Sequence, residues 1–152
     1  MEKAFFDDLK VGDRFETPGR TLTESEIIAF AALHDPQFFH IDVEAASSGP
    51  YGGLIASGFQ TLVTGYRMLF QTVYIAPEAS LGSPGIDELR WVKPVRPGDT
   101  LRMRGEVLEL LPSRSKPDRG VARFYFEVVN QRGEVVMTLR PMWMLRKRPS
   151  AG

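Results

Sequence analysis

The segment from Gly58 to about Tyr74 most constrains the fold, because its apolar residues recur at helical spacing over more than four turns. These apolar residues are Phe59, Leu62, Val63, Tyr66, Leu69, Phe70 and Val73. The positions between them are polar and, apart from Arg67, uncharged, which is typical of a helix enclosed by other structure. We therefore expect a long central helix that the rest of the chain must cover.

Period-two alternation replaces the helical spacing after this segment. Leu89, Trp91, Lys93 and Val95 form a first alternating run, the turn signal Pro97-Gly98-Asp99 follows, and a second run starts at Leu101. Two more runs flank the hairpin signal Asn130-Gln131-Arg132-Gly133, and residues 112–120 read as a polar loop. The C-terminal half is therefore expected to form four strands joined mainly by short turns.

The N-terminal part predicts a short strand and a first helix. Residues 14–22 can supply the strand, and Thr23 is an N-cap candidate, with Glu26 completing a capping box. Pro36 disfavours helical geometry at Asp35, so the helix should end there and leave the Asp35 side chain at its C-terminal edge. Residues 41–56 then read as an acidic turn from Asp42 to Ala46 followed by a glycine-rich loop.

These elements together predict an α+β fold, because an antiparallel sheet must cover one long helix. A twisted antiparallel β-sheet wrapped around a long central helix is the hot-dog arrangement. The 152 residues, of which 43% are apolar, suffice for one domain with a real core and are too few for two of ordinary size. We expect a single domain over residues 1–152, with an ordered core from about 5 to 146.

Composition excludes several classes of function. The formal net charge is zero, so the field of the whole molecule favours neither nucleic acid nor an anionic membrane as a partner. The chain has no cysteine, which removes disulfides, thiolate catalysis and cysteine metal sites. The acidic start of the chain is unlike a secretory signal, and no apolar run approaches the length of a membrane span. We expect a cytoplasmic protein.

Asp35 and His40 stand five positions apart beyond the end of the first helix, and a glycine-rich turn from Gly52 to Gly58 leads into the long helix. An acid and a histidine can exchange protons with a bound molecule. The N–H groups at a helix start can stabilise an oxyanion. We interpret the pair and the turn as an acid–base site beside an oxyanion site, chemistry that needs no metal.

Each of these features also has a plain structural interpretation. Asp35-Pro36 can simply stop a helix, His40 can be an ordinary hydrogen-bonded histidine, and the glycines can serve turns and caps. The glycine spacing matches neither a dinucleotide-binding nor a P-loop pattern. The combination of acid, histidine and glycine turn favours the chemical interpretation. His34 is an alternative base, but it lies inside the helical stretch and need not face the same way as Asp35.

Four segments together resemble the MaoC-like dehydratases, relatives of the R-specific enoyl-CoA hydratases. These segments are Asp35-x-x-x-x-His40-x-Asp42, the turn from Gly52 to Gly58, the run from Gly85 to Trp91, and Pro94-Val95-x-Pro97-Gly98-Asp99-Thr100-Leu101. The similarity extends from Phe5 to the hairpin at 130–133. It implies a hot-dog fold, a homodimer or higher oligomer, and a lyase that hydrates 2-enoyl-CoA or dehydrates 3-hydroxyacyl-CoA.

Carried over by position, the resemblance implies Asp35 and His40 as the catalytic pair and the backbone N–H of Gly58 as the oxyanion donor. It implies no cofactor, since coenzyme A enters only as part of the substrate, and either CoA or an acyl carrier could present the thioester. The chain departs from the hydratase pattern in one place: Pro36 directly follows Asp35, and Gln37 stands where asparagine is usual. Gln37 can still donate and accept hydrogen bonds.

Candidate substrate contacts surround this site in the sequence: Gln37, Phe39, Tyr51, Ser57 and Arg90. Phe38 can join Phe39 and Tyr51 in lining an acyl pocket, although aromatic residues serve equally as core. The strand region is locally basic at Arg90, Lys93, Arg96, Arg102 and Arg104. Such residues can meet the phosphates of coenzyme A or can simply be solvated, as we expect for residues 146–148.

Two alternatives to a hydratase stay open. A hot-dog thioesterase would direct water to the thioester carbonyl, and a non-catalytic acyl-thioester-binding subunit would retain the fold without turnover. Neither the length and branching of the acyl chain nor the group that activates water, Asp35 or His40, follows from the sequence.

Overall fold

The computed structural model describes residues 3–72 and 75–151 of the chain. A short 3-10 turn η1 (Phe6–Asp8) and two brief strands precede three helices and the long helix α4 (Gly58–Thr72); a second 3-10 turn and four strands follow. The remaining elements are β1 (Arg14–Glu16), β2 (Arg20–Thr21), α1 (Glu24–His34), α2 (Phe38–Ile41), α3 (Val43–Ser47), η2 (Pro77–Ala79), β3 (Gly85–Trp91), β4 (Thr100–Pro112), β5 (Arg119–Val129) and β6 (Val135–Arg146). Val73 and Tyr74, expected at the end of the long helix, lie outside the described residues.

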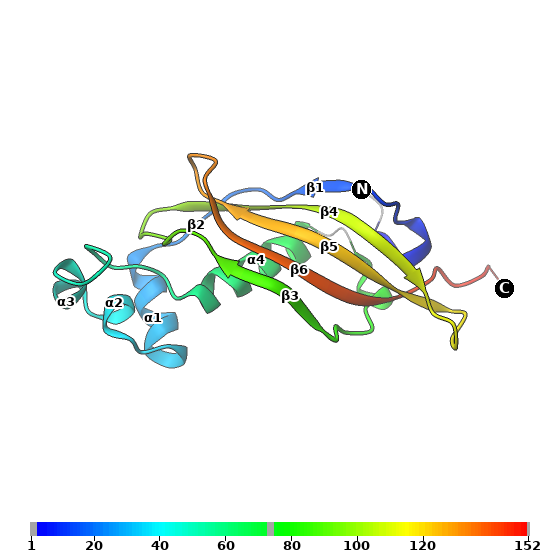
Figure 1. Ribbon diagram of the computed structural model, residues 1–152, viewed down its shortest axis with the longest axis horizontal. Helices are drawn as coiled ribbons and strands as arrows, with labels where there is room; N and C mark the ends of the chain where they lie inside the picture. The colour runs from blue at the N-terminus through cyan, green and yellow to red at the C-terminus, as the bar shows by residue number, and fades with distance from the viewer. Residues whose placement is uncertain (1–2, 73–74, 152) are drawn as a thin grey trace.

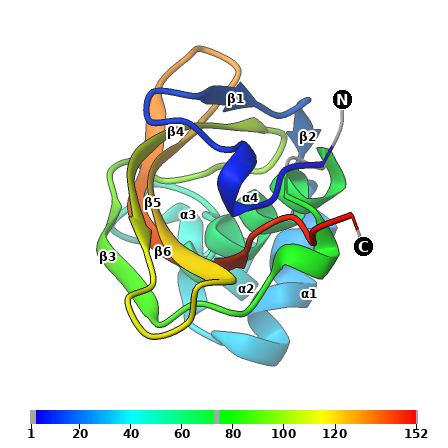
Figure 2. The same ribbon diagram turned by 90° about the vertical axis from the view of Figure 1, so that its right-hand side faces the viewer.

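The strands form one antiparallel sheet in the order β1-β4-β5-β6-β3, and β2 adds a short pair to β4. Alternate residues of β4, β5 and β6 are buried, as period-two patterning predicts, and Phe124 and Phe126 of β5 are among the largest fully buried side chains. The sheet curves along α4, while α1, α2 and α3 gather at one end of it (Figures 1 and 2). The expected α+β hot-dog architecture is confirmed.

The helix boundaries at the front of the chain follow from their caps. Thr23 Oγ1 accepts the N–H of Glu26 at 3.2 Å, which confirms the N-cap of α1. The Glu26 carboxylate pairs with Arg20 at 3.3 Å, so only half of the expected capping box forms. Asp35 is the C-cap of α1, as the following proline predicts.

Three expected elements differ in the structure. The strand expected over 14–22 is broken between β1 and β2, where Pro18 has no N–H to donate to a strand ladder. The run from 89 to 95 leaves the sheet after Trp91 and before Pro94. Residues 42–46 form most of α3 rather than a turn, since the Asp42 side chain caps the helix by accepting the Ala45 N–H at 2.9 Å.

The helix α4 is enclosed on one side, as expected, but this side does not include all of its apolar residues. The buried residues of α4 are Gln60, Thr61, Thr64, Gly65, Met68 and Leu69. The helix lies so close to the sheet that a Cβ on Gly65 would be 3.2 Å from Val128 Cγ2, which favours glycine at this position. Phe59, Val63 and Phe70 therefore face outward, each with more than half of its surface exposed.

Candidate active site

A cavity of about 500 Å³ opens where α2, the start of α4 and the end of β3 meet, and it holds the predicted acid–base pair. Its walls come from three segments, within residues 35–40, 51–61 and 91–95. Asp35, His40 and Gly58 all line it, so the fold brings the three predicted groups into one space.

Asp35 enters this cavity from the C-terminal end of α1, where its N–H still bonds the Ala31 carbonyl at 2.8 Å. Its Oδ1 accepts a hydrogen bond from Gln37 Nε2 at 2.8 Å, and its Oδ2 accepts one from Ser57 Oγ at 2.7 Å. Burial acts to raise the pKa of the Asp35 carboxyl, but the hydrogen bonds from Gln37 and Ser57 and the nearby His40 outweigh it and lower the pKa below the usual 3.8. Asp35 is therefore a carboxylate at neutral pH.

His40 is buried on α2, with its Nε2 3.3 Å from Asp35 Oδ2. Its Nδ1 lies 2.7 Å from the carbonyl oxygen of Ile55, which can only accept a hydrogen bond, so Nδ1 carries a proton. When the ring is neutral, Nε2 is then the unprotonated nitrogen and presents its lone pair beside the Asp35 carboxylate. The Phe39 ring packs edge-on against the imidazole, with centroids 4.6 Å apart, and restricts its rotation.

Ser57 caps α4 and connects it to Asp35. The Ser57 side chain accepts the N–H of Phe59 at 3.2 Å, and its carbonyl accepts the N–H of Thr61 at 3.1 Å. Gly58 is thus the first residue of α4, where helix geometry provides no acceptor for its N–H and the helix dipole favours negative charge. An ionised acid, a histidine and a helix N-terminus facing one cavity can exchange protons with a bound molecule and stabilise an oxyanion on it.

Trp91, at the end of β3, was missed as a site residue. A Cβ on Gly58 would lie 2.4 Å from the Cε2 and Nε1 atoms of Trp91, so the missing side chain of this glycine makes room for the indole. Trp91 Nε1 also donates to the Gly58 carbonyl oxygen at 2.8 Å. Period-two alternation places Trp91 on the same face of the strand as Leu89. From this pattern, Trp91 could have been predicted to face α4.

The candidate substrate contacts separate into two groups. Gln37, Phe39 and Tyr51 line the cavity, whereas Ser57 is fully buried and directs its hydroxyl at Asp35. Arg90 is not among the lining residues; it is exposed and donates to the Leu89 carbonyl.

The alternative base and most of the basic residues also lie elsewhere. His34 is exposed, and its ring packs against Phe30 in a tilted arrangement with centroids 4.8 Å apart. Of the five basic strand residues, Lys93 lines the cavity and is paired with Glu134. Arg96 donates to the Tyr51 carbonyl oxygen.

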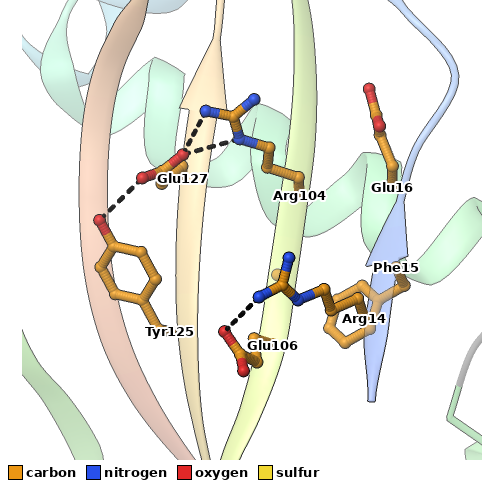
Figure 3. A pocket seen from close by; sticks show the side chains of 8 residues that line it. Arg14, Phe15, Glu16, Arg104, Glu106, Tyr125 and Glu127 are labelled. Atoms are coloured by element: carbon orange, nitrogen blue, oxygen red, sulfur yellow. Dashed lines mark hydrogen bonds and ion pairs between the residues drawn. The ribbon is translucent and has the colours of Figure 1, made fainter. Parts of the chain in front are cut away.

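A second cavity, of about 600 Å³, lies on the face of the sheet away from α4 (Figure 3). Its charged groups are largely paired with one another: Arg104 with Glu127 at 2.7 Å and Arg14 with Glu106 at 3.8 Å. Tyr125 donates to the same Glu127 at 3.0 Å. This internal pairing leaves the smaller cavity, with its acid, histidine and helix N-terminus, as the better candidate for chemistry.

Over residues 3–72 and 75–151, no cluster of three or more His, Cys, Asp or Glu side chains is arranged to hold a metal ion. Within the same residues, no helix combines the length and apolar character needed to cross a membrane.

The chain is similar to a known domain family and to proteins of known structure. The MaoC like domain family matches residues 8–123. The crystal structure of the MaoC-like dehydratase from Rhodospirillum rubrum superposes with a TM-score of 0.90 at 39% identity, covering 96% of this chain and 99% of that one. Mesaconyl-CoA hydratase from Cereibacter sphaeroides is 31% identical over 151 residues, 97% of this chain and 42% of the relative.

A protein from Mycobacterium tuberculosis described as having a double hotdog fold shares the fold, with a TM-score of 0.79 at 21% identity. The match covers 99% of this chain and 46% of that protein, so the chain corresponds to one half of it. The family model covers most of the chain, and the Rhodospirillum rubrum structure is similar along nearly its whole length, so the protein belongs to the family of MaoC-like dehydratases.

Proposed function

We propose that this protein adds water to 2-enoyl thioesters, or removes it from 3-hydroxyacyl thioesters, without a cofactor. The observation that carries the proposal is the approach of His40 Nε2 to Asp35 Oδ2, 3.3 Å, inside a cavity that also contains the first residue of α4. The similarity to a protein named mesaconyl-CoA hydratase and to one named MaoC-like dehydratase supports this chemistry. Coenzyme A, as part of the substrate, is the thioester carrier we propose.

In the hydration direction, Asp35 and His40 hold a water molecule beside the β-carbon of the enoyl group. One of them takes a proton from this water as its oxygen bonds to the β-carbon, and the pair delivers a proton to the α-carbon. The dyad thus ends the turnover in its starting protonation state. Each acid or base contributes on the order of 10²–10⁴ in rate.

The Gly58 N–H is the donor we assign to the thioester oxygen. Negative charge develops on this oxygen as the enolate forms, and a helix N-terminus stabilises it. Loss of one such donor typically costs on the order of 10²–10³ in kcat. Phe39, Tyr51 and Phe59, which line the same cavity, are the surfaces available to the acyl chain.

The test is hydration of a conjugated enoyl-CoA by the purified protein, followed as loss of its ultraviolet absorbance. Asp35→Asn and His40→Gln are expected to abolish the reaction while leaving the protein folded, as circular dichroism would show. Full activity in either variant would exclude the assignment. Release of free thiol would instead identify a thioesterase, and a raised melting temperature with acyl-CoA but no turnover would identify a binding subunit.

We also propose that two copies associate through α4 and β3. Phe59, Val63 and Phe70 form an outward apolar stripe on α4, and Trp91 and Val92 continue it at the end of β3. In addition, β3 is the last strand of the sheet order, so its outer edge has no partner strand within the described residues. An apolar stripe beside an open edge fits a second hot-dog unit, and the double hotdog relative, about twice as long, supports this partner.

A further inference from the structure

A continuous line of hydrogen bonds joins Trp91 to the acid–base pair. Trp91 Nε1 donates to the Gly58 carbonyl at 2.8 Å, and the N–H of the same peptide group, that of Phe59, donates to Ser57 Oγ at 3.2 Å. Ser57 Oγ then donates to Asp35 Oδ2 at 2.7 Å, the oxygen that faces His40. One peptide group is therefore held at both ends, by a side chain on β3 and by a side chain that reaches Asp35.

The direction of each bond is determined by the chemistry of the groups. An indole N–H can only donate and a carbonyl can only accept. Ser57 Oγ accepts the Phe59 N–H, so its single proton is available for Asp35 Oδ2. Hydrogen bonds aligned in this way polarise one another, and the final donor favours the ionised carboxylate.

Steric contact holds the indole in this position. The ring occupies the place where a Cβ of residue 58 would stand, and it packs edge-on against Phe59 with centroids 5.8 Å apart. The same first turn of α4 contains the Gly58 N–H that the proposed function assigns to the thioester oxygen. A shift of Trp91 would therefore move both the oxyanion donor and the Ser57 contact to Asp35.

We propose that Trp91 is a positioning residue, which acts through the Gly58–Phe59 peptide and Ser57 to orient the Asp35 carboxylate relative to the Gly58 N–H. The kinetic part of this inference rests on the proposed hydratase function, whereas the link between Trp91 and Asp35 does not. The alternative is that Trp91 serves only as a wall of the cavity, and the two roles predict different effects.

The test compares three variants. Trp91→Phe retains an aromatic ring but lacks the indole N–H, Ser57→Ala removes the hydroxyl nearest Asp35, and Trp143→Phe is the matched control for losing an indole N–H in the core. If Trp91→Phe fails to fold, 3-benzothienylalanine at position 91 replaces only the N–H by sulfur. The other titratable groups that line the cavity are His40, Tyr51 and Lys93, and all three are retained in every variant.

The first readout needs no substrate: the carboxyl ¹³C titration of Asp35 by NMR. The proposal expects the pKa of Asp35 to rise in Trp91→Phe, to rise further in Ser57→Ala, and to stay at the wild-type value in Trp143→Phe. An Asp35 titration that is identical in Trp91→Phe and wild type overturns the proposal. This result is independent of whether the protein hydrates enoyl-CoA.

The second readout is the split between kcat and KM for an enoyl-CoA. Loss of one neutral hydrogen bond from the line should lower kcat about 3–10-fold in Trp91→Phe, with KM within about twofold of wild type. A rise in KM alone would make Trp91 a wall of the cavity and overturn the positioning role. If wild type itself gives no turnover, the proposed function fails, and the NMR titration still decides whether Trp91 acts on Asp35.

Discussion

The Nδ1 atom of His40 lies 2.7 Å from the carbonyl oxygen of Ile55, in the glycine-rich turn that leads to α4. The turn therefore does more than connect two helices, because it selects which nitrogen of the imidazole carries the proton. One ring nitrogen satisfies a buried carbonyl, and the other faces Asp35 at 3.3 Å. The structural and chemical duties of His40 are thus divided between two atoms.

This division predicts different results for two substitutions. An asparagine at position 40 can place its side-chain N–H near the position of Nδ1 and retain the bond to Ile55, whereas alanine leaves that carbonyl without its partner. His40→Ala should lose about 1–3 kcal/mol of unfolding free energy, and His40→Asn should lose less. Both variants lack Nε2, so both should lose at least about 100-fold in kcat. Urea unfolding and enoyl-CoA hydration measure the two effects, and equal stability of the two variants would contradict the structural role of Nδ1.

Gly58→Ala is predicted to displace Trp91 rather than to obstruct substrate directly. Its Cβ would lie 2.4 Å from two indole atoms, and such overpacking typically costs about 1–3 kcal/mol. Combining it with Trp91→Ala should remove the clash, so the double variant should be more stable than the sum of the single effects predicts. Thermal or urea unfolding of wild type, the two single variants and the double variant measures this double-mutant cycle.

Gly85→Ala is the matched control, because a Cβ at Gly85 would meet no atom within 4 Å. It should change stability little. Additive effects of Gly58→Ala and Trp91→Ala would show that the indole does not account for the glycine at position 58.

The sequence predicted which residues of α4 share a side of the helix, but not which side is buried. Periodicity shows which residues share a side of a helix, and Phe59, Val63 and Phe70 do share one. It does not show whether that side meets the chain's own sheet or faces outward. The close approach of α4 to the sheet decides this, since only 3.2 Å separates Val128 Cγ2 from the place that a Cβ on Gly65 would take.

The site was predictable where local rules apply. Pro36 ends α1 at Asp35, and the glycine-rich turn precedes α4, so two of the groups were correctly placed at element ends. Ser57 meets Asp35 across 22 positions and Trp91 meets Gly58 across 33, and contacts at such separations depend on packing that the pattern does not contain. Alternation could not have excluded Arg90, because Val92 is on the same alternating face and does line the cavity.

The free energy of unfolding should fall at acid pH, because the folded state stabilises two carboxylates in their ionised form. Hydrogen bonds from Lys93, Arg132 and Asn130 lower the pKa of Glu134 from 4.5 to about 2, and the pKa of Asp35 is also below its ordinary value. Both pKa values are lower in the folded state than in the unfolded chain, where they are near 4–4.5. The two carboxylates therefore contribute their full stabilisation of the fold above that pH, and this contribution is lost as the pH falls toward about 2. Urea unfolding at several pH values should show this decline.

Glu134→Gln should make the decline between pH 4.5 and 2 shallower, because its side chain no longer binds a proton on unfolding. The comparison is made at constant ionic strength, since Glu134 is near the surface and salt screens its partners. An unchanged slope would mean that the Glu134 contacts with Lys93 and Arg132 contribute nothing to folding.

The outward stripe on α4 predicts that one charge there will separate two copies of the chain. Val63 lies in the middle of the stripe between Phe59 and Phe70, and in a two-fold interface Val63→Glu introduces two carboxylates into one apolar surface. Sedimentation should therefore give a dimer for wild type and a monomer for Val63→Glu. Val11→Glu is the matched control, since Val11 is 65% exposed in the turn before β1, and it should sediment as wild type does. Burying two carboxylates without a counter-ion costs more than such an interface can offset. If Val63→Glu still sediments as a dimer, the contact between copies must therefore lie on another surface.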